Sequence, residues 1–184
     1  MDDVCKREDR LCWIDLETTG LDAKTHAILE IGVVITEADL TFVAERSVVV
    51  WQPDDALALM PDVVREMHTR SGLINEVRSS GYNARQAAIH ALIFMSVHLD
   101  ANKSPMCGNS IGTLDRPFLE HHMPTILGWL HYRMIDVSSV KELVRRWNPQ
   151  HAYGAKKLAH RALDDCHESI EEARWYRDAL FAGP

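Results

Sequence analysis

The chain has 184 residues, a length that fits one domain with its own hydrophobic core, since chains usually split only above about 250–300 residues. Hydrophobic residues make up 46% of the sequence and charged residues 26%, an ordinary composition for a globular domain. The formal net charge of −7 disfavours a protein that grips a long phosphate backbone, because that affinity comes mostly from Lys and Arg. It is compatible with a nucleic-acid enzyme that uses metal ions or holds a very short strand.

Membrane insertion and secretion are not indicated by the sequence. The longest apolar runs, such as residues 91–95, fall far short of the ~20 residues that a membrane-spanning helix requires. The first ten residues carry acidic side chains and no apolar core, so we expect neither a secretory signal nor a transit peptide. The four cysteines form no C-x-x-C pair, which favours reduced thiols packed as small hydrophobes in the cytoplasm, with an organellar location left open.

Secondary structure is predicted from β-prone runs and helical periodicity. We expect strands over residues 11–16, 28–36, 42–51, 106–107 and 133–137. Asn83 is a candidate N-cap for a helix, and Ser139 with Glu142 fits a capping box for another. A last long helix is expected over residues 164–181, and His121 with His122 is interpreted as a solvated helix end.

The order of these elements predicts the fold class. Strands come first and then alternate with helices, which is typical of an α/β domain with a mixed sheet flanked by helices. No internal repeat and no linker rich in Gly, Ser or Pro divides the chain. We therefore expect residues 1–184 to form a single domain, with residues 1–10 as a loosely ordered N-terminal extension.

Asp15 and Glu17 are the first candidates for chemistry. Residues i and i+2 of a strand point to the same face, so both carboxylates project together and raise each other's pKa. A hard divalent cation with oxygen ligands would relieve that repulsion. A solvated acidic strand end is the alternative, and the pair alone does not decide between them.

Two further places attract attention, although neither is specific by itself. Asp115 follows a short strand and a loop at the expected start of a helix, where an acid is more often an N-cap than a metal ligand. His160 precedes Asp165 by five residues at a helix start, which can bring an imidazole and a carboxylate to one site.

Taken together, these five residues carry a specific resemblance. In their order and spacing they are similar to the DEDDh superfamily of 3′→5′ exonucleases. The flanking motifs narrow the resemblance to the oligoribonuclease family; they are residues 13–22, 107–110, 131–133, 136–147, 161–165 and 168–170. The likeness covers nearly the whole chain and implies a ribonuclease H-like fold, a mixed β-sheet flanked by α-helices. The sequence departs from the family pattern at Thr18, usually Met, at Val63, usually Trp, and in a loop between Asn109 and Asp115 that is one residue longer.

The resemblance implies a metal-dependent hydrolase. The four acids would hold two Mg²⁺ or Mn²⁺ ions, and His160 would act as the general base on the attacking water. The implied reaction is the 3′→5′ hydrolysis of RNA of about two to five nucleotides, especially 5′-phosphorylated dinucleotides, to nucleoside 5′-monophosphates. No stable complex with long nucleic acid is expected.

The family's substrate contacts also map onto single residues of this chain. They are Leu21, His68, Ser110, Arg133, Ser138 and Ser139. Leu21 would be a wedge between the two terminal bases and His68 would lie near the 3′ nucleotide, whereas the other four would cap the 5′ phosphate. Plain readings stay open: Leu21 as core, Arg133 as a surface ion pair and Ser138 as a helix cap. Tyr132 resembles a tyrosine that reaches the active site from the partner subunit, so a homodimer is implied.

Two other functions remain as alternatives. A DEDDh exonuclease that trims or proofreads longer RNA or DNA 3′ ends shares the acidic residues, although the chain lacks basic tracts and carries the cap residues. A catalytically inactive relative that serves as a binding module is disfavoured, because all four acids and His160 are present.

Overall fold

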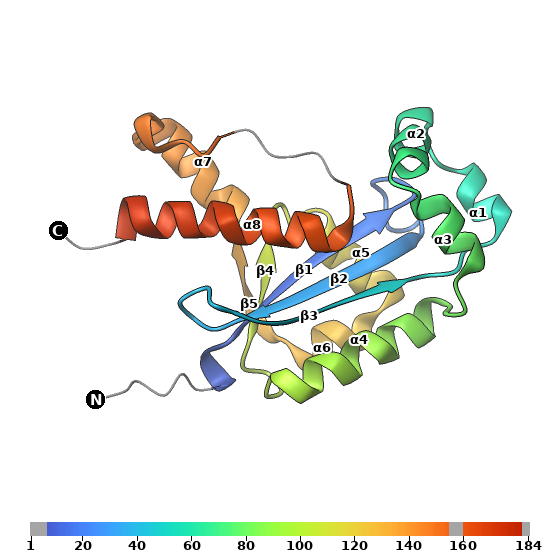
Figure 1. Cartoon of the computed structure of the whole chain (residues 1–184), viewed down its shortest axis with the longest axis horizontal. Helices are drawn as coiled ribbons and strands as arrows, with labels where there is room; N and C mark the ends of the chain where they lie inside the picture. The colour runs from blue at the N-terminus through green and yellow to red at the C-terminus, as the bar shows by residue number, and fades with distance from the viewer. Residues whose placement is uncertain (1–6, 155–159, 182–184) are drawn as a thin grey trace.

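Five strands form one mixed sheet at the centre of the molecule. The computed structural model describes residues 7–154 and 160–181. The strands are β1 (Leu11–Thr18), β2 (Ile28–Thr36), β3 (Phe42–Val49), β4 (Pro105–Gly108) and β5 (His131–Asp136). They lie in the order β3-β2-β1-β4-β5; β2 is antiparallel to both β3 and β1, whereas β4 is parallel to both β1 and β5 (Figure 1). The expected mixed α/β sheet is confirmed.

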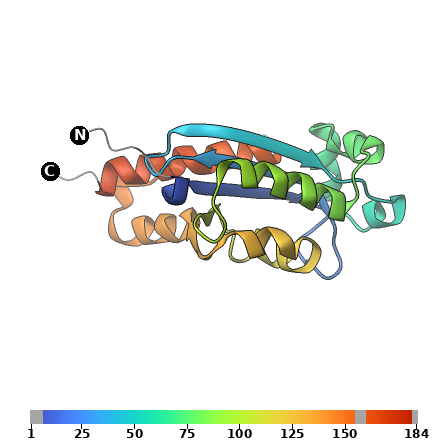
Figure 2. The same ribbon diagram turned by 90° about the horizontal axis from the view of Figure 1, so that it is seen from below.

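Helices cover both faces of this sheet and one of its ends. They are α1 (Asp54–Ala58), α2 (Asp62–Arg70), α3 (Leu73–Ser79), α4 (Ala84–His98), α5 (Asp115–His122), α6 (Pro124–Trp129), α7 (Val137–Trp147) and α8 (Ala162–Tyr176). α4 and α6 lie along one face, whereas α8 crosses the other and α7 packs beside it (Figure 2). The short helices α1, α2 and α3 gather at one end of the sheet, near the end of β1.

The alternation of side chains along β1 divides the hydrophobic core in two. Cys12 and Ile14 pack among the residues of the α4 and α6 side, and Trp13 packs with residues of α7 and α8. All nine residues of β2 are buried, because this strand has a paired strand on each side and helices on both faces. The sheet is therefore a rigid platform for the groups at the end of β1.

Several predicted boundaries hold and one cap is wrong. The strand over 28–36 has the predicted bounds, and Asn83 caps α4 through a capping box with Gln86. The capping box predicted for Ser139 and Glu142 is wrong, because β5 runs directly into α7 and the Asp136 carboxylate accepts the amide of Ser138. The expected last helix begins earlier, at Ala162, and continues as a π-helix over Arg177–Phe181.

The start of the chain is anchored from residue 7 onward. Residues 1–6 of the N-terminal extension lie outside the described residues, whereas Arg7–Asp9 form a 3₁₀ turn. Arg10 forms an ion pair with Glu37 at 2.9 Å and donates to the carbonyl of His98 at 2.9 Å. Within residues 7–154 and 160–181, no helix is both long and apolar enough to cross a membrane.

Three cysteines lie inside this fold. Cys12, Cys107 and Cys166 are free thiols, and each is fully buried. Burial raises the pKa of all three above the ordinary value, so the thiolate form is suppressed. Cys5 lies outside the described residues.

Candidate active site

Three carboxylates meet where the end of β1 approaches the first turn of α8. Asp15 and Glu17 project from the same face of β1, and Asp165 comes from α8. One carboxylate oxygen from each lies within 4.8 Å of the others. The predicted pairing of the strand acids with Asp165 is thus seen in the structure.

A glycine permits this close approach of α8. Gly32 of β2 lies directly opposite Asp15 in the sheet register. A Cβ atom at Gly32 would lie only 2.7 Å from the backbone carbon of Ala162, the first residue of α8. Since only glycine leaves this space, the N-terminus of α8 can rest against the sheet and present Asp165 to Asp15.

Asp115 joins these acids through the backbone of β1. It is the first residue of α5, 5% exposed, and its Oδ1 accepts the amide of Leu16 at 2.9 Å. That amide lies between Asp15 and Glu17, so α5 is fastened to the strand between its two acidic residues. Leu114 occupies the N-cap position, so the plain interpretation of Asp115 as an N-cap is wrong.

The pKa values reflect this crowding. Burial, followed by the charges of Asp165, Glu30 and Asp115, raises the pKa of Glu17 to about 8, although Arg161 lowers it. Burial also raises the pKa of Asp115 to about 7, against the amide of Leu16, which lowers it. Buried carboxylates that repel one another in this way are the donor set of a hard divalent cation, so the residues present fit a metal site.

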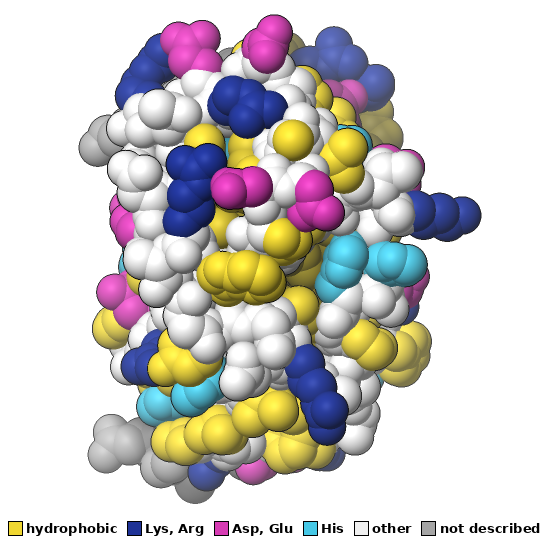
Figure 3. Space-filling model, turned by 90° about the vertical axis from the view of Figure 1, so that its right-hand side faces the viewer, with side chains coloured by type: hydrophobic (Ala, Val, Ile, Leu, Met, Phe, Trp, Pro, Cys, Tyr) yellow, Lys and Arg dark blue, Asp and Glu magenta, His cyan; other side chains and the backbone are white. Residues whose placement is uncertain are grey.

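The acids open onto a cleft of about 200 Å³. Its walls combine acidic and apolar groups: Asp15, Leu16, Glu17, Thr18, Gly20, Leu21, Val64, Met67, Asn109, Leu114, Asp115 and Phe118. Figure 3 shows this end of the molecule, where hydrophobic side chains gather beside acidic groups and histidines. A cleft with carboxylates on one wall and apolar side chains on another suits a ligand that has both a charged backbone and flat bases.

Leu21 lies at the mouth of the cleft on the loop after β1. Its side chain is 77% exposed, so it is not a core residue. The loop is held from α5, where Nε2 of His122 lies 3.0 Å from the carbonyl oxygens of both Ala23 and His26. The interpretation of His122 as part of a solvated helix end is therefore wrong, although His121 is exposed as expected.

His68 stands beside Glu17 as a fully buried residue of α2. Its Nε2 is 2.9 Å from the carbonyl oxygen of Thr18, and a carbonyl only accepts, so Nε2 carries the proton. Nδ1 lies 3.9 Å from Oε2 of Glu17 and has no hydrogen-bond partner among the described residues. Burial lowers the pKa of His68, which leaves a neutral ring whose buried Nδ1 lies beside Glu17.

His160 lies directly before α8, between residues 155–159, which are outside the description, and Arg161. Its side chain is half-buried and its backbone is left-handed, with φ at 53°. His160 is also near enough for its charge to lower the pKa of His68. His160 therefore lies close to His68, at the N-terminal end of α8.

Two of the predicted phosphate-cap serines are joined in one polar network. The hydroxyls of Ser110 and Ser138 lie 3.1 Å apart, and Ser138 donates to Oδ1 of Asn109 at 3.0 Å. The Asp136 carboxylate accepts the amides of Ser110 and Ser138, each at 3.0 Å. Ser138 is therefore a partner of Ser110 and not the helix cap, a role that Asp136 fills.

Comparisons with known proteins decide the family. The family model described as Exonuclease matches residues 12–173. An oligoribonuclease of Shewanella loihica is 48% identical over 176 residues, covering 95% of this chain and 97% of its own. One of Mycobacterium sp. strain KMS is 49% identical and covers 96% of this chain and 83% of its own. The chain belongs to the oligoribonuclease family. The resemblance inferred from its motifs is confirmed.

Solved structures show the same fold. Exonuclease I of E. coli, in complex with a dT13 oligonucleotide bearing a 5′ label, superposes on 94% of this oligoribonuclease-family chain with a TM-score of 0.74 at 15% identity. A zinc-bound form of the E. coli exonuclease with single-stranded DNA gives a TM-score of 0.72. This chain spans about two fifths of those chains, 41% in each case. The expected ribonuclease H-like fold is confirmed.

Some residues expected from the oligoribonuclease family lie apart from the serine network. Tyr132 on edge strand β5 is 72% exposed, and the Arg133 guanidinium lies 5.3 Å from the centre of its ring. Within the described part of the chain, Arg133 has no ion pair, so that plain alternative finds no support. Ser139 is an exposed residue of α7 and takes no part in the described serine network. Val63, on α2, is 74% exposed.

Sequence reasoning missed several residues that shape this oligoribonuclease-family site. Asn109 lines the cleft and its Nδ2 donates to Ser169 and Glu172, at 3.0 and 3.1 Å, so it links the serines to α8. Met67 and Phe118 line the apolar wall from α2 and α5. Asn109 lies within the family motif at residues 107–110, so its role in the site could have been inferred from the sequence. Met67 and Phe118 carry no such signal beyond ordinary helical patterning.

Proposed function

We propose that this chain is a 3′→5′ exoribonuclease that hydrolyses very short oligoribonucleotides to nucleoside 5′-monophosphates. The observation that carries the proposal is the meeting of Asp15, Glu17 and Asp165 at a small, partly apolar cleft in a member of the oligoribonuclease family. The cleft favours a substrate of a few nucleotides. The net charge of −7 agrees, because such a substrate has few phosphates to neutralise.

The acids would hold the divalent metal. Asp15, Glu17 and Asp165 offer convergent oxygen atoms, and Asp115 is held beside them by the Leu16 amide. We propose two ions, Mg²⁺ or Mn²⁺. When bound, they supply a more acidic water and stabilise negative charge on the leaving 3′ oxygen. The protein's own part is to keep four mutually repelling carboxylates in a fixed arrangement.

His160 would take the proton from the attacking water. A neutral imidazole can accept a proton from water. His160 lies two residues before Ala162, the first residue of α8, and so at the start of the helix that carries Asp165. His68 would serve a different purpose near the 3′ nucleotide, since its bond to the carbonyl of Thr18 fixes it beside Glu17.

The substrate would lie between two fixed ends. Leu21, exposed at the mouth of the cleft, would wedge between the terminal bases. At the other end, Ser110 and Ser138 would receive the 5′ phosphate, with Arg133 and the less central Ser139 completing the cap. A closed cap would leave no exit for a further nucleotide, which explains a preference for dinucleotides.

We further propose that the protein acts as a homodimer in the cytoplasm. Edge strand β5 carries the exposed side chains of Tyr132, Met134 and Ile135, and α7 adds Leu143 and Trp147. Such an edge would be covered by a second copy, which would bring Tyr132 to the neighbouring active site. Loss of activity on dilution, reversed by concentration, would support the dimer, whereas constant specific activity in a monomer by light scattering would exclude it.

Turnover as a function of substrate length tests the function. We expect 5′-phosphorylated RNA dinucleotides to be hydrolysed much faster per end than 7-mers or 20-mers, and only with Mg²⁺ or Mn²⁺. Equal rates on 20-mers would instead favour the enzyme that trims longer strands. No hydrolysis of any length with either metal would favour the inactive binding module.

A further inference from the structure

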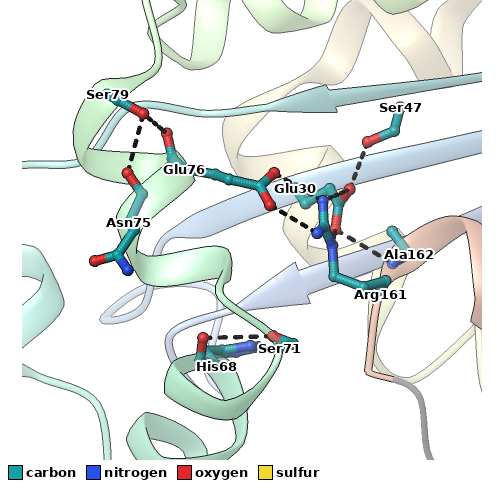
Figure 4. A network of polar contacts seen from close by, with 9 residues as sticks. All are labelled: Glu30, Ser47, His68, Ser71, Asn75, Glu76, Ser79, Arg161 and Ala162. Atoms are coloured by element: carbon teal, nitrogen blue, oxygen red, sulfur yellow. Dashed lines mark hydrogen bonds and ion pairs between the residues drawn. The ribbon is translucent and has the colours of Figure 1, made fainter.

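Arg161 is the N-cap residue of α8 and joins three distant parts of the chain (Figure 4). Its Nε and Nη2 donate to the two carboxylate oxygens of Glu30 on β2, each at 3.0 Å. Its Nη1 and Nη2 donate to the two oxygens of Glu76 on α3, each at 2.9 Å. One guanidinium therefore grips two carboxylates at once, with both oxygens of each engaged.

Glu30 is the buried end of this clamp. It is 1% exposed, and its carboxylate also accepts the Ser47 hydroxyl at 2.5 Å and the Ala162 amide at 3.3 Å. The bonds from Arg161 and Ser47 lower its pKa although burial opposes them, so Glu30 is ionised inside the protein.

Glu30 also lies at the edge of the acidic cluster. In the sheet register it is directly opposite Glu17, so the two carboxylates share one face of the sheet. Glu30 is thus a further buried carboxylate next to the proposed metal ligands. Its four donors, two from Arg161 and one each from Ser47 and Ala162, occupy both of its oxygens.

The backbone of Arg161 lies between the two groups that the reaction needs. His160, directly before it, has a left-handed φ of 53°, a conformation that is strained for a non-glycine residue. The Arg161 carbonyl accepts the amide of Asp165 at 3.0 Å, which closes the first turn of α8. A residue fixed at its side chain therefore holds a strained neighbour on one side and a helix start on the other.

We propose that Arg161 is a positioning residue for catalysis. By bridging Glu30 and Glu76, it fixes His160 and the first turn of α8 against the carboxylates of β1, and it keeps Glu30 out of the metal site. The inference rests on the proposed exonuclease function. It involves no contact between Arg161 and the substrate.

The geometry demands arginine at this position. A planar guanidinium offers five N–H donors in a fixed fork, which matches two carboxylates at once, whereas a lysine ammonium acts as a point charge. Arg161→Lys would keep the charge that neutralises Glu30 but lose the double grip. This substitution therefore separates neutralisation from positioning.

The test compares Arg161→Gln and Arg161→Lys with a matched control, Arg10→Gln. Arg10 likewise holds a half-buried glutamate, Glu37, but it directly precedes β1, whereas Asp15 and Glu17 lie toward the other end of that strand. We expect Arg161→Gln to lower kcat on a 5′-phosphorylated dinucleotide about 100-fold, as for a misplacement of roughly 1 Å, with KM within about threefold. Arg161→Lys should recover less than about a tenth of the wild-type kcat, and Arg10→Gln should keep it.

A second readout needs neither metal nor substrate. Amide hydrogen exchange, followed by mass spectrometry in the metal-free protein, should speed up in peptides covering residues 160–168 of Arg161→Gln and not in those of Arg10→Gln. Mn²⁺ titration calorimetry should show binding retained, because all proposed ligands are present. If exchange there is unchanged, the clamp does not position this segment and the proposal is overturned.

Outcomes in kcat also decide the matter. Normal kcat in Arg161→Gln would overturn the proposal, as would an equal loss in Arg10→Gln, which would indicate general destabilisation. If Arg161→Gln fails to fold, Glu76→Gln removes only the half-exposed end of the clamp and should lower kcat about three- to tenfold; no change would overturn the proposal. If the wild type itself hydrolyses no RNA, the proposed function fails, while the exchange comparison still tests the clamp.

Discussion

The amide of Leu16 donates to Oδ1 of Asp115 at 2.9 Å, and this contact joins the acidic end of β1 to a helix 99 residues further along the chain. Asp115 thereby acts on the strand as well as on the proposed metal. Its carboxylate is buried, and its bond to the Leu16 amide fastens the start of α5 to β1. The same bond explains why Asp115 is held near Glu17 despite their mutual repulsion.

Asp115→Ala is expected to lower kcat more than tenfold at saturating Mg²⁺ while the protein stays folded. Loss of one metal position should cost several kcal/mol of transition-state stabilisation, and each factor of ten corresponds to about 1.36 kcal/mol. Steady-state kinetics and circular dichroism measure the two effects. Activity above a tenth of wild type would exclude Asp115 as a metal ligand.

Stability without metal should fall as the pH rises. Because the folded protein raises the pKa of Glu17 to about 8 and of Asp115 to about 7, it binds more protons than the unfolded chain between about pH 4 and 8. The free energy of unfolding should therefore drop by several kcal/mol through this range.

Thermal melts in EDTA from pH 5 to 8.5 test this, with Glu17→Gln as the matched variant. Glu17→Gln should flatten the dependence and be more stable than wild type near pH 8. Added Mn²⁺ should raise the wild-type Tm most at high pH, where the carboxylates lose their protons. A wild-type Tm that rises steadily to pH 8 would contradict the assigned pKa shifts.

His160→Ala should lower kcat by about 10²–10⁴-fold with little effect on substrate affinity, as expected for a lost general base. Raising the pH should restore part of the rate, because hydroxide replaces the base. Single-turnover kinetics from pH 6 to 10 separate binding from chemistry. Normal turnover with weak dinucleotide binding would instead assign His160 to substrate binding.

Arg133→Ala should weaken binding of a 5′-phosphorylated dinucleotide by roughly 1.5–3 kcal/mol, the range for a hydrogen bond to a charged group. The same change should leave a dinucleotide without that phosphate almost unaffected, and Arg133→Lys should restore little. The affinities for the two dinucleotides are measured by calorimetry in Ca²⁺, which also takes oxygen ligands and is used in place of Mg²⁺ to slow turnover. An equal loss for both ligands would refute the phosphate cap.

Gly32→Ala should reduce activity at least tenfold and lower Tm, because its new Cβ would lie 2.7 Å from the backbone of Ala162 and push α8 from the sheet. Gly128→Ala is the matched control, since no atom lies within 4 Å of its added Cβ. Both variants are compared by kcat and thermal melting. Full activity in Gly32→Ala would mean that α8 can shift without disturbing the site.

The sequence predicts the strands of this fold better than its short helices. The run over 28–36 is apolar except for Glu30 and Thr36, and its bounds follow from that pattern alone. The helices α1, α2 and α3 were not predicted, because five to nine residues give too few turns for a periodic signal. The false capping box at Ser139 arose because Asp136 was assigned only to a strand. Asp136 is in fact both the last residue of β5 and the N-cap of α7.

The acidic cluster was predictable because the four acids and His160 stand in the order and at the spacing of the DEDDh exonucleases. The Arg161 clamp was not, since its partners Glu30 and Glu76 lie 131 and 85 residues away, and no local pattern pairs them. The same limit applies to His122, whose bonds to the Leu21 loop cross 96 and 99 residues. Such contacts depend on tertiary packing, which single-sequence periodicity does not encode.

The three buried cysteines can report how often the folded structure opens to solvent. Cys12 and Cys107 lie on neighbouring strands and Cys166 on α8, directly after Asp165 of the acidic cluster, and all three are shielded and protonated in the folded state. With Cys5 replaced by serine, an alkylating reagent should reach these thiols only when helices separate from the sheet or the chain unfolds: α4 and α6 for Cys12, and α7 and α8 for Cys107 and Cys166. The labelling rates of the individual cysteines would therefore measure how fast these layers separate, and saturating metal should slow the labelling of Cys166.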